Sequence, residues 1–174
     1  MIQDPQRRRL ALGAAALTLG TAWRPTTAWA LDPPYGEVIL TVSGRISRPN
    51  QGGEARFSRE MIAALPQQSF TTSTPWYAAP RRFEGPYLRD LLALVGASGT
   101  ELHARALNDY QADLPIADAQ ELDVLLALSI DRQPLRVRDK GPLFIIYNFD
   151  ARPELRRERY YARCVWQLGQ LEVR

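Results

Sequence analysis

A run of small hydroxyl residues precedes a tryptophan and a pair of arginines near the middle of the chain. Residues 71–74 read Thr-Thr-Ser-Thr, Trp76 follows shortly after, and Arg81 and Arg82 are adjacent. Hydroxyl and guanidinium groups hold a phosphate, a carboxylate or another oxyanion, and an indole ring stacks on a flat group. The stretch therefore indicates a site for a polar or anionic ligand. An ordinary polar loop has the same composition, and the residues alone leave both interpretations open.

Three further positions join this stretch in the predicted site. Asn108 and Tyr110 flank the predicted turn of a hairpin, and Lys140 ends a basic loop. The simpler interpretation of Asn108 is a turn residue, and Trp76 is equally typical of a core aromatic. The predicted binding residues are Thr72, Thr74, Trp76, Arg82, Asn108, Tyr110 and Lys140.

Cysteine and histidine are too scarce for several kinds of site. Cys164 is the only cysteine, so no disulfide can form within the chain, and its apolar surroundings predict a small buried hydrophobe. His103 is the only histidine, which excludes zinc sites built from several His or Cys side chains. A hydrolase is also disfavoured, because the sequence has no Gly-x-Ser-x-Gly motif and His103 has no evident serine partner.

The first thirty residues have the pattern of an export signal. Arg7, Arg8 and Arg9 precede an apolar stretch over residues 10–20, and residues 28–30 read Ala-Trp-Ala. This pattern predicts a signal peptide over residues 1–30, cleavage after Ala30 and a periplasmic protein. An uncleaved N-terminal anchor is the alternative, and the arginines fit either the general or the twin-arginine export route.

Removing the leader changes the charge of the protein. Residues 1–30 contain four arginines and one acidic residue, Asp4. Without them, the 22 basic and 19 acidic residues of the chain become 18 of each. The sequence pI of about 9.3 thus depends on the leader. We therefore predict no nucleic-acid partner.

Beyond the leader, many strands and few short helices are predicted, which is typical of a single α+β domain over residues 31–174. Ser58 is expected to cap a short helix, and residues 83–85 are expected to lead into a second helix with the apolar stripe Leu88, Leu91, Leu92 and Val95. The remaining predicted elements are strands at residues 37–46, 102–107, 111–116, 124–130, 143–149 and 165–173, a helical turn at 118–122 and a charged helix or arm at 153–161.

Five stretches in this order resemble the sulfite-oxidase-type molybdopterin-binding domain. Residues 83–92 are similar to its W-x-G-x-x-L-x-x-L-L segment, and residues 106–116 to its A-x-D-G-Y…I-P-L hairpin. The other three similarities are at residues 124–135, 140–143 and 165–168. The resemblance spans about residues 37–173 and implies that family's fold.

The sequence also departs from the pattern that the resemblance implies for catalytic members. Those members ligate molybdenum through a cysteine thiolate whose place here falls within residues 71–74, with Thr72 the best match. A neutral alcohol is a much poorer metal ligand than a thiolate. Phe144 stands where the family has an arginine, and Asn148 where it has a proline. The chain looks like a short periplasmic branch of the family that has lost the metal ligand.

Two functions follow from these observations. The first is a cofactor-free module that binds or senses a small anionic or polar ligand, with a membrane sensor or redox partner. The second is a molybdopterin-dependent oxidoreductase with a threonine or serine oxygen in place of the thiolate. The basic residues available for its cofactor phosphate are Arg81, Arg82, Arg105, Arg136, Arg138 and Lys140. The catalytic residues of such an enzyme are not indicated by the sequence.

Overall fold

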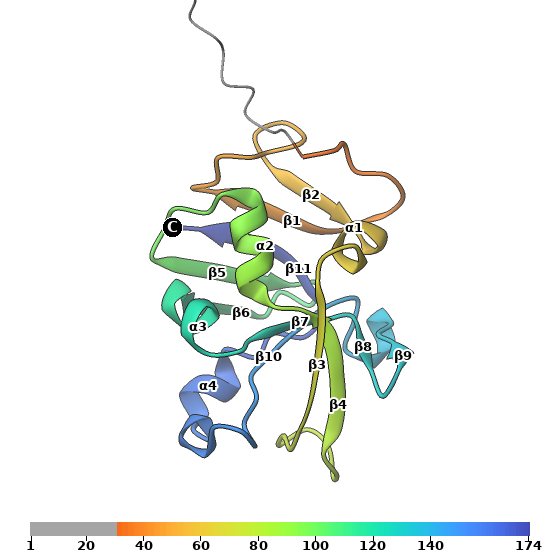
Figure 1. Cartoon of the computed structure of the whole chain (residues 1–174), viewed down its shortest axis with the longest axis vertical. Helices are drawn as coiled ribbons and strands as arrows, with labels where there is room; N and C mark the ends of the chain where they lie inside the picture. The colour runs from red at the N-terminus through yellow and green to blue at the C-terminus, as the bar shows by residue number, and fades with distance from the viewer. Residues whose placement is uncertain (1–30) are drawn as a thin grey trace, which may run out of the picture.

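The computed structural model describes residues 31–174. The predicted signal peptide and its cleavage site lie outside the described residues. The chain forms a five-stranded sheet in the order β2-β1-β11-β5-β6, a four-stranded sheet in the order β3-β4-β8-β9, and a two-stranded ribbon of β10 and β7 (Figure 1). Within residues 31–174, no helix combines the length and the apolar content that crossing a bilayer requires.

The predicted α+β class is confirmed by the elements along the chain. They are β1 (Val38–Gly44), β2 (Ala55–Ser58), α1 (Arg59–Ala63), β3 (Gln67–Thr72), β4 (Arg81–Pro86), α2 (Leu88–Val95), β5 (Glu101–Ala106), β6 (Gln111–Pro115), α3 (Ile116–Glu121), β7 (Leu125–Ala127), β8 (Ser129–Ile130), β9 (Gln133–Pro134), β10 (Phe144–Ile146), α4 (Glu158–Ala162) and β11 (Leu168–Val173), with short 3-10 helices at Val137–Asp139 and Pro153–Leu155.

Helices α2 and α3 lie against one face of the five-stranded sheet (Figure 1). The predicted stripe of α2 is confirmed, because Leu88, Leu91, Leu92 and Val95 are all buried. Gly96 ends this helix in the left-handed conformation, with a φ of 62°, which glycine adopts without the steric cost of a Cβ. The Ser58 cap of α1 is likewise present, with the hydroxyl accepting from the backbone N–H of Met61.

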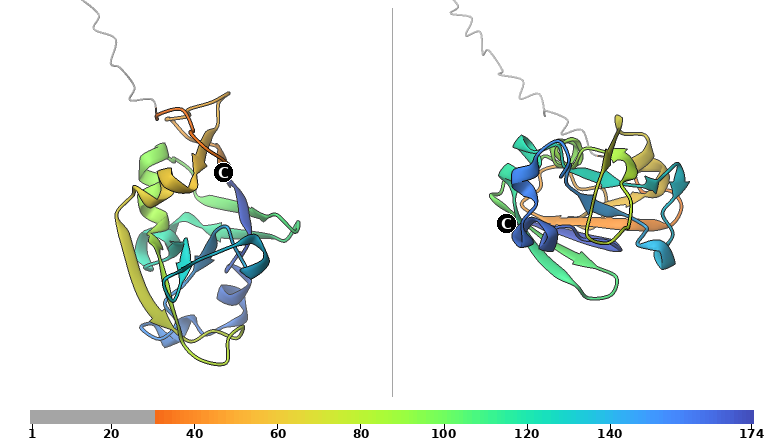
Figure 2. Two further views of the ribbon diagram at one scale, coloured as in Figure 1. Left: turned by 90° about the vertical axis from the view of Figure 1, so that its right-hand side faces the viewer. Right: turned by 90° about the horizontal axis from the view of Figure 1, so that it is seen from below.

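Residues 83–85 lead into helix α2 as predicted, but they belong to strand β4, which is not among the strands predicted from the sequence. Gly85 explains the difference: a Cβ at this position would lie 2.1 Å from the carbonyl oxygen of Leu126. Glycine thus lets β4 approach β7 closely, and the buried Phe83 holds the strand against the core. The β3–β4 hairpin forms a long arm along one side of the molecule (Figure 2).

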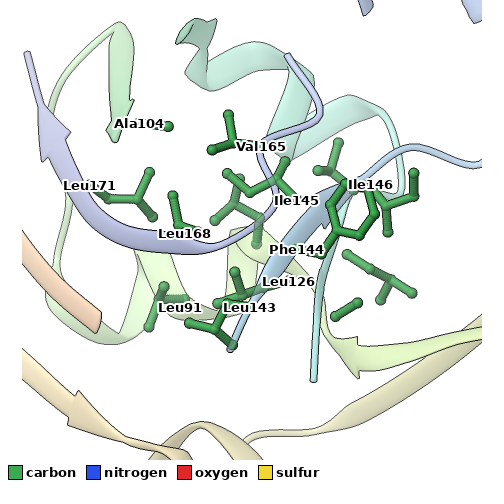
Figure 3. Packing of buried hydrophobic residues seen from close by; sticks show 14 of the residues in the cluster. Leu91, Ala104, Leu126, Leu143, Phe144, Ile145, Ile146, Val165, Leu168 and Leu171 are labelled. Carbon is green, nitrogen blue, oxygen red and sulfur yellow. The ribbon is translucent and has the colours of Figure 1, made fainter. Parts of the chain in front are cut away.

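The two most apolar predicted strands are present in shortened form. Residues 124–130 divide at Leu128 into β7 and β8, which join different sheets. Residues 143–149 contain β10, which pairs with β7 in the centre of the core, where Leu126, Leu143 and Phe144 pack together (Figure 3). The predicted burial of Cys164 is confirmed: 2% of it is exposed, and burial raises the pKa of its thiol.

Candidate functional site

The hydroxyl run is occupied by contacts within the protein. Thr72 ends β3 with 0% of its surface exposed, and its Oγ1 accepts a hydrogen bond of 3.1 Å from the backbone N–H of Asp150. The backbone N–H and the hydroxyl of Ser73 donate to Asp150 Oδ2 over 2.9 and 3.1 Å. These bonds fasten the end of the arm to the loop that follows β10.

The carboxylate of Asp150 places a negative charge beside the hydroxyl run. Burial by itself would raise the pKa of Asp150, but the hydrogen bonds from Ser73 and from the Arg156 guanidinium outweigh it, and the pKa lies below its ordinary value. The group is therefore ionised at neutral pH. An anionic ligand at Thr72 and Ser73 would meet this charge at close range, so the run itself is a poor anion site.

Thr74 differs from the other predicted threonine, Thr72, in having a hydroxyl without a hydrogen-bond partner among residues 31–174. Its Oγ1 is shielded from solvent and has no hydrogen-bond partner within residues 31–174. A buried hydroxyl without a partner costs about 1–3 kcal/mol. Thr74 is therefore the position in this run where a ligand group would gain most from a hydrogen bond.

Trp76 packs as part of an aromatic cluster. Its ring centroid lies 5.4 Å from that of Trp166, 5.8 Å from that of Phe144 and 6.1 Å from that of Tyr161. Rings at these distances and inclined to one another stabilise a core. The cluster fills the space beside Phe144, which is 0% exposed.

The two neighbouring arginines of β4 project to opposite faces of the strand. Arg82 binds Glu84 Oε1 and Ser69 Oγ on one face, over 3.0 and 3.1 Å. Arg81 lies on the other face, where its guanidinium carbon is 5.3 Å from the centroid of the Tyr77 ring. Arg81 Nε lies 2.6 Å from Asp131 Oδ2 but outside hydrogen-bond alignment, so the contact is an ion pair.

Asn108 and Tyr110 lie at the tip of the β5–β6 hairpin, which projects from the body of the molecule (Figure 2). Asn108 Oδ1 accepts from the backbone N–H of Tyr110 over 3.2 Å, and Asp109 between them has a φ of 66°. The Tyr110 hydroxyl donates to the carbonyl oxygen of Ala162 over 2.7 Å. Both side chains thus stabilise a turn and its docking onto the end of α4.

Lys140 lies at a pocket of about 390 Å³ between the arm and the β8–β9 turn. Its Nζ is 4.7 Å from the centroid of the Trp166 ring and 5.9 Å from that of Tyr77. Within residues 31–174 no carboxylate lies within ion-pair distance of it. The pocket is lined by Tyr77, Arg81, Ile130, Gln133, Pro134, Leu135, Arg138, Asp139 and Lys140.

The structure thus does not bring the seven predicted residues into one pocket. Lys140 lines the pocket just described, whereas Thr72 and Arg82 are engaged elsewhere and Asn108 and Tyr110 stabilise a turn. Two residues that line this pocket, Tyr77 and Arg81, are not among the seven predicted residues. The alternation of a β-strand places Arg81 on the same face as Phe83, because the two are two residues apart. Phe83 is buried, so this is the inward face of β4.

The residues at the predicted metal position do not fit a thiolate-ligated molybdenum centre. Thr72 offers a buried alcohol that already binds Asp150, and Phe144 is apolar and covered by rings. Cys164 lies in the segment before β11 and is buried there. Among the described residues, no group of three or more His, Cys, Asp and Glu side chains is arranged to hold a metal ion.

His103 and Arg105 have local partners on the five-stranded sheet. His103 Nδ1 lies 2.6 Å from Asp113 Oδ1 on the neighbouring strand β6, and Arg105 pairs with Asp109. Both pairs are of the kind that an exposed sheet face carries. Arg105, on β5, does not line the pocket at Lys140.

Comparison with known proteins identifies the domain. The family model of the oxidoreductase molybdopterin binding domain matches residues 54–147, which is more than half of the chain. Among solved structures, the sulfane dehydrogenase SoxCD from Paracoccus pantotrophus matches with a TM-score of 0.58 and 17% sequence identity. The match covers 77% of this chain and 37% of the SoxCD chain, so this chain spans little more than a third of that protein. No curated protein matches the sequence.

Proposed function

Because this chain belongs to the oxidoreductase molybdopterin binding domain family and has the sulfite-oxidase-like fold, we propose that it uses that fold, without a metal, as an exported module that binds a small anionic or polar ligand. The family supplies the scaffold. The ligand-binding role is proposed from the side chains of this chain.

The observation that carries the proposal is the environment of Thr72. Its hydroxyl is buried and accepts from the Asp150 backbone, and the Asp150 carboxylate binds Ser73 beside it. A metal centre with its anionic cofactor at this position would have to displace these bonds and lie close to an ionised carboxylate. Two cations with ring neighbours lie elsewhere, at Arg81 and Lys140 around Tyr77.

A molybdopterin-dependent oxidoreductase with an oxygen ligand is the second candidate. Membership of the family favours it, and so does Thr74, whose shielded Oγ1 has no partner in the described part of the chain. The two candidates differ in one measurable property, which is the cofactor content of the protein.

Metal analysis and pterin release from protein purified out of the periplasm separate the two candidates. We expect molybdenum and pterin far below one equivalent per chain, with a molybdopterin enzyme purified from the same host as the loading control. About one molybdenum per chain would establish the second candidate. In that case the metal contents of Thr74→Ala and Thr72→Ala show which threonine oxygen ligates the molybdenum. Cys164→Ser should leave the metal content unchanged.

Export and partnership complete the proposal. A ligand-binding domain outside the cytoplasm acts by presenting its bound state to another protein, which we propose is a membrane sensor or a redox partner. N-terminal sequencing of the exported protein should find Leu31 as the first residue. Retention of Met1 would instead favour an anchored protein.

A further inference from the structure

Two cations approach the Tyr77 ring in the pocket between the arm and the β8–β9 turn. The Arg81 guanidinium carbon lies 5.3 Å from the ring centroid and Lys140 Nζ lies 5.9 Å from it. The outer nitrogens of Arg81 make no hydrogen bond within residues 31–174, and Lys140 Nζ makes no hydrogen bond or ion pair there and lies 4.7 Å from the centroid of the Trp166 ring. A ring face stabilises a cation without neutralising its charge. Both groups are therefore available to an incoming anion.

The charge of the pocket fits a ligand with a single negative charge. Arg81 is paired with Asp131 over 2.6 Å, and Arg138 faces Asp139 over 3.5 Å. These two pairs are internally balanced, so of the three cations that line the pocket Lys140 is the one without a counter-ion among residues 31–174. A ligand with two or three charges would meet Asp131 and Asp139 as well as the cations.

Apart from Gln133, the uncharged part of the lining is aromatic or aliphatic. Ile130 and Leu135 contribute carbon surface at the base of the pocket, and Pro134 adds more at the β8–β9 turn. Burial raises the pKa of the Tyr77 hydroxyl, and Arg81 opposes this shift without cancelling it. The phenol is therefore neutral at physiological pH and offers a ring face and a hydrogen-bond donor. The volume of about 390 Å³ is within the range of small-molecule sites.

The position of Lys140 is fixed by the backbone. The residue has a φ of 71°, which is uncommon for a side chain other than glycine, and its carbonyl oxygen accepts from the N–H of Gln167 over 3.0 Å. The next residue, Gly141, has no room for a side chain, because a Cβ would lie 2.5 Å from the backbone of Leu135. Non-glycine residues in this conformation concentrate at functional sites.

We propose that this pocket binds a small organic monoanion, such as a carboxylate or sulfonate on a flat ring, with its charge at Lys140 and Arg81 and its apolar body on Leu135, Ile130 and Tyr77. This assignment rests on the proposed ligand-binding function and specifies its site and ligand class. It replaces Thr72 and Arg82 as binding residues by Tyr77 and Arg81.

Benzoate is the probe for this site, with acetate and benzyl alcohol as matched controls. Acetate retains the charge without the ring, and benzyl alcohol retains the ring without the charge. Calorimetric or NMR titration of the full chain should find benzoate binding about ten-fold or more tightly than either control, because both contacts contribute. Equal affinity for benzoate and benzyl alcohol would overturn the assignment.

Substitutions locate the bound probe. Lys140→Gln and Arg81→Gln should each weaken benzoate binding by about ten-fold or more, since each removes a charged donor. Arg82→Gln is the matched control on the same strand and should bind like the parent protein. Unchanged thermal unfolding of each variant shows that the fold persists. Benzoate binding that Lys140→Gln and Arg81→Gln leave unaltered contradicts this site.

The titration tests the pocket, and the metal analysis tests the proposed function, so the two proposals can be rejected separately. Benzoate binding that ignores both substitutions, in protein free of molybdenum, would remove this site and leave the proposed function standing. Stoichiometric molybdenum would remove the proposed function, whatever the affinity for benzoate.

Discussion

Thr72 illustrates how a single side chain changes the interpretation of a site. The sequence presents it among four consecutive hydroxyl residues, which is typical of an exposed polar loop. In the structure it ends a strand, is fully buried and binds the backbone of Asp150. Its partner is 78 residues away in the chain, and no local pattern predicts such a contact.

The Thr72 contact predicts a loss of stability on removal of its hydroxyl. Thr72→Val keeps the shape of the side chain but leaves the Asp150 N–H without its acceptor, which should cost about 1–2 kcal/mol of unfolding free energy. Chemical denaturation measures this difference. Thr71→Val, at the exposed neighbour on the same strand, is the control and should change stability by about 0.5 kcal/mol or less. Equal stability of the two variants would contradict the assigned role of Thr72.

The Asp150 carboxylate predicts a dependence of stability on acid. Its pKa in the folded protein lies below the ordinary value of 3.8, so its contribution is complete above that value and is lost as the pH falls through the folded pKa. The difference in unfolding free energy between the parent and Asp150→Asn should therefore shrink on acidification below pH 3.8. Parallel curves for the two proteins across this range would show that Asp150 makes no such contribution.

At the scale of elements, sequence periodicity predicts those helices and strands whose conformation is determined by their own residues. The stripe of α2, the cap of α1 and the β5–β6 hairpin follow from residue types at short spacing and are all present. Strand β4 is not among the predicted strands, because its residues directly precede that stripe and are taken only as the entry to the helix. Its conformation is determined by tertiary contact with β7 and β8, which the sequence of β4 does not contain.

Gly85 should therefore be intolerant of a side chain. The Cβ of Gly85→Ala would lie 2.1 Å from the Leu126 carbonyl oxygen, and backbone on both sides must shift to admit it. We expect a loss of about 2–4 kcal/mol in the free energy of unfolding. Gly53→Ala is the comparison: it has open space around it and a φ of 85°, so only a conformational cost of about 1 kcal/mol applies. A loss at Gly85 no larger than at Gly53 would show that β4 and β7 separate freely.

At the scale of the whole molecule, the order of five weak motifs along the chain is enough to predict the fold. No single motif predicts the binding site. Five short similarities in sequence order suffice for the domain, because each marks a strand or turn that the core requires. The proposed site depends on the relative position of Tyr77, Arg81 and Lys140, which come from the arm and from a loop some sixty residues later. Only the folded chain brings these residues together.

The central claim is that the folded, ligand-binding state of this protein requires no molybdopterin. The most direct test compares the melting temperature of the protein from a host that makes the cofactor with that from a host that does not. A cofactor that binds the folded state and not the unfolded chain stabilises the folded state, so bound cofactor raises the melting temperature. We expect the same melting temperature from both hosts and the same increase on addition of benzoate. A higher melting temperature only in the cofactor-making host would contradict the claim.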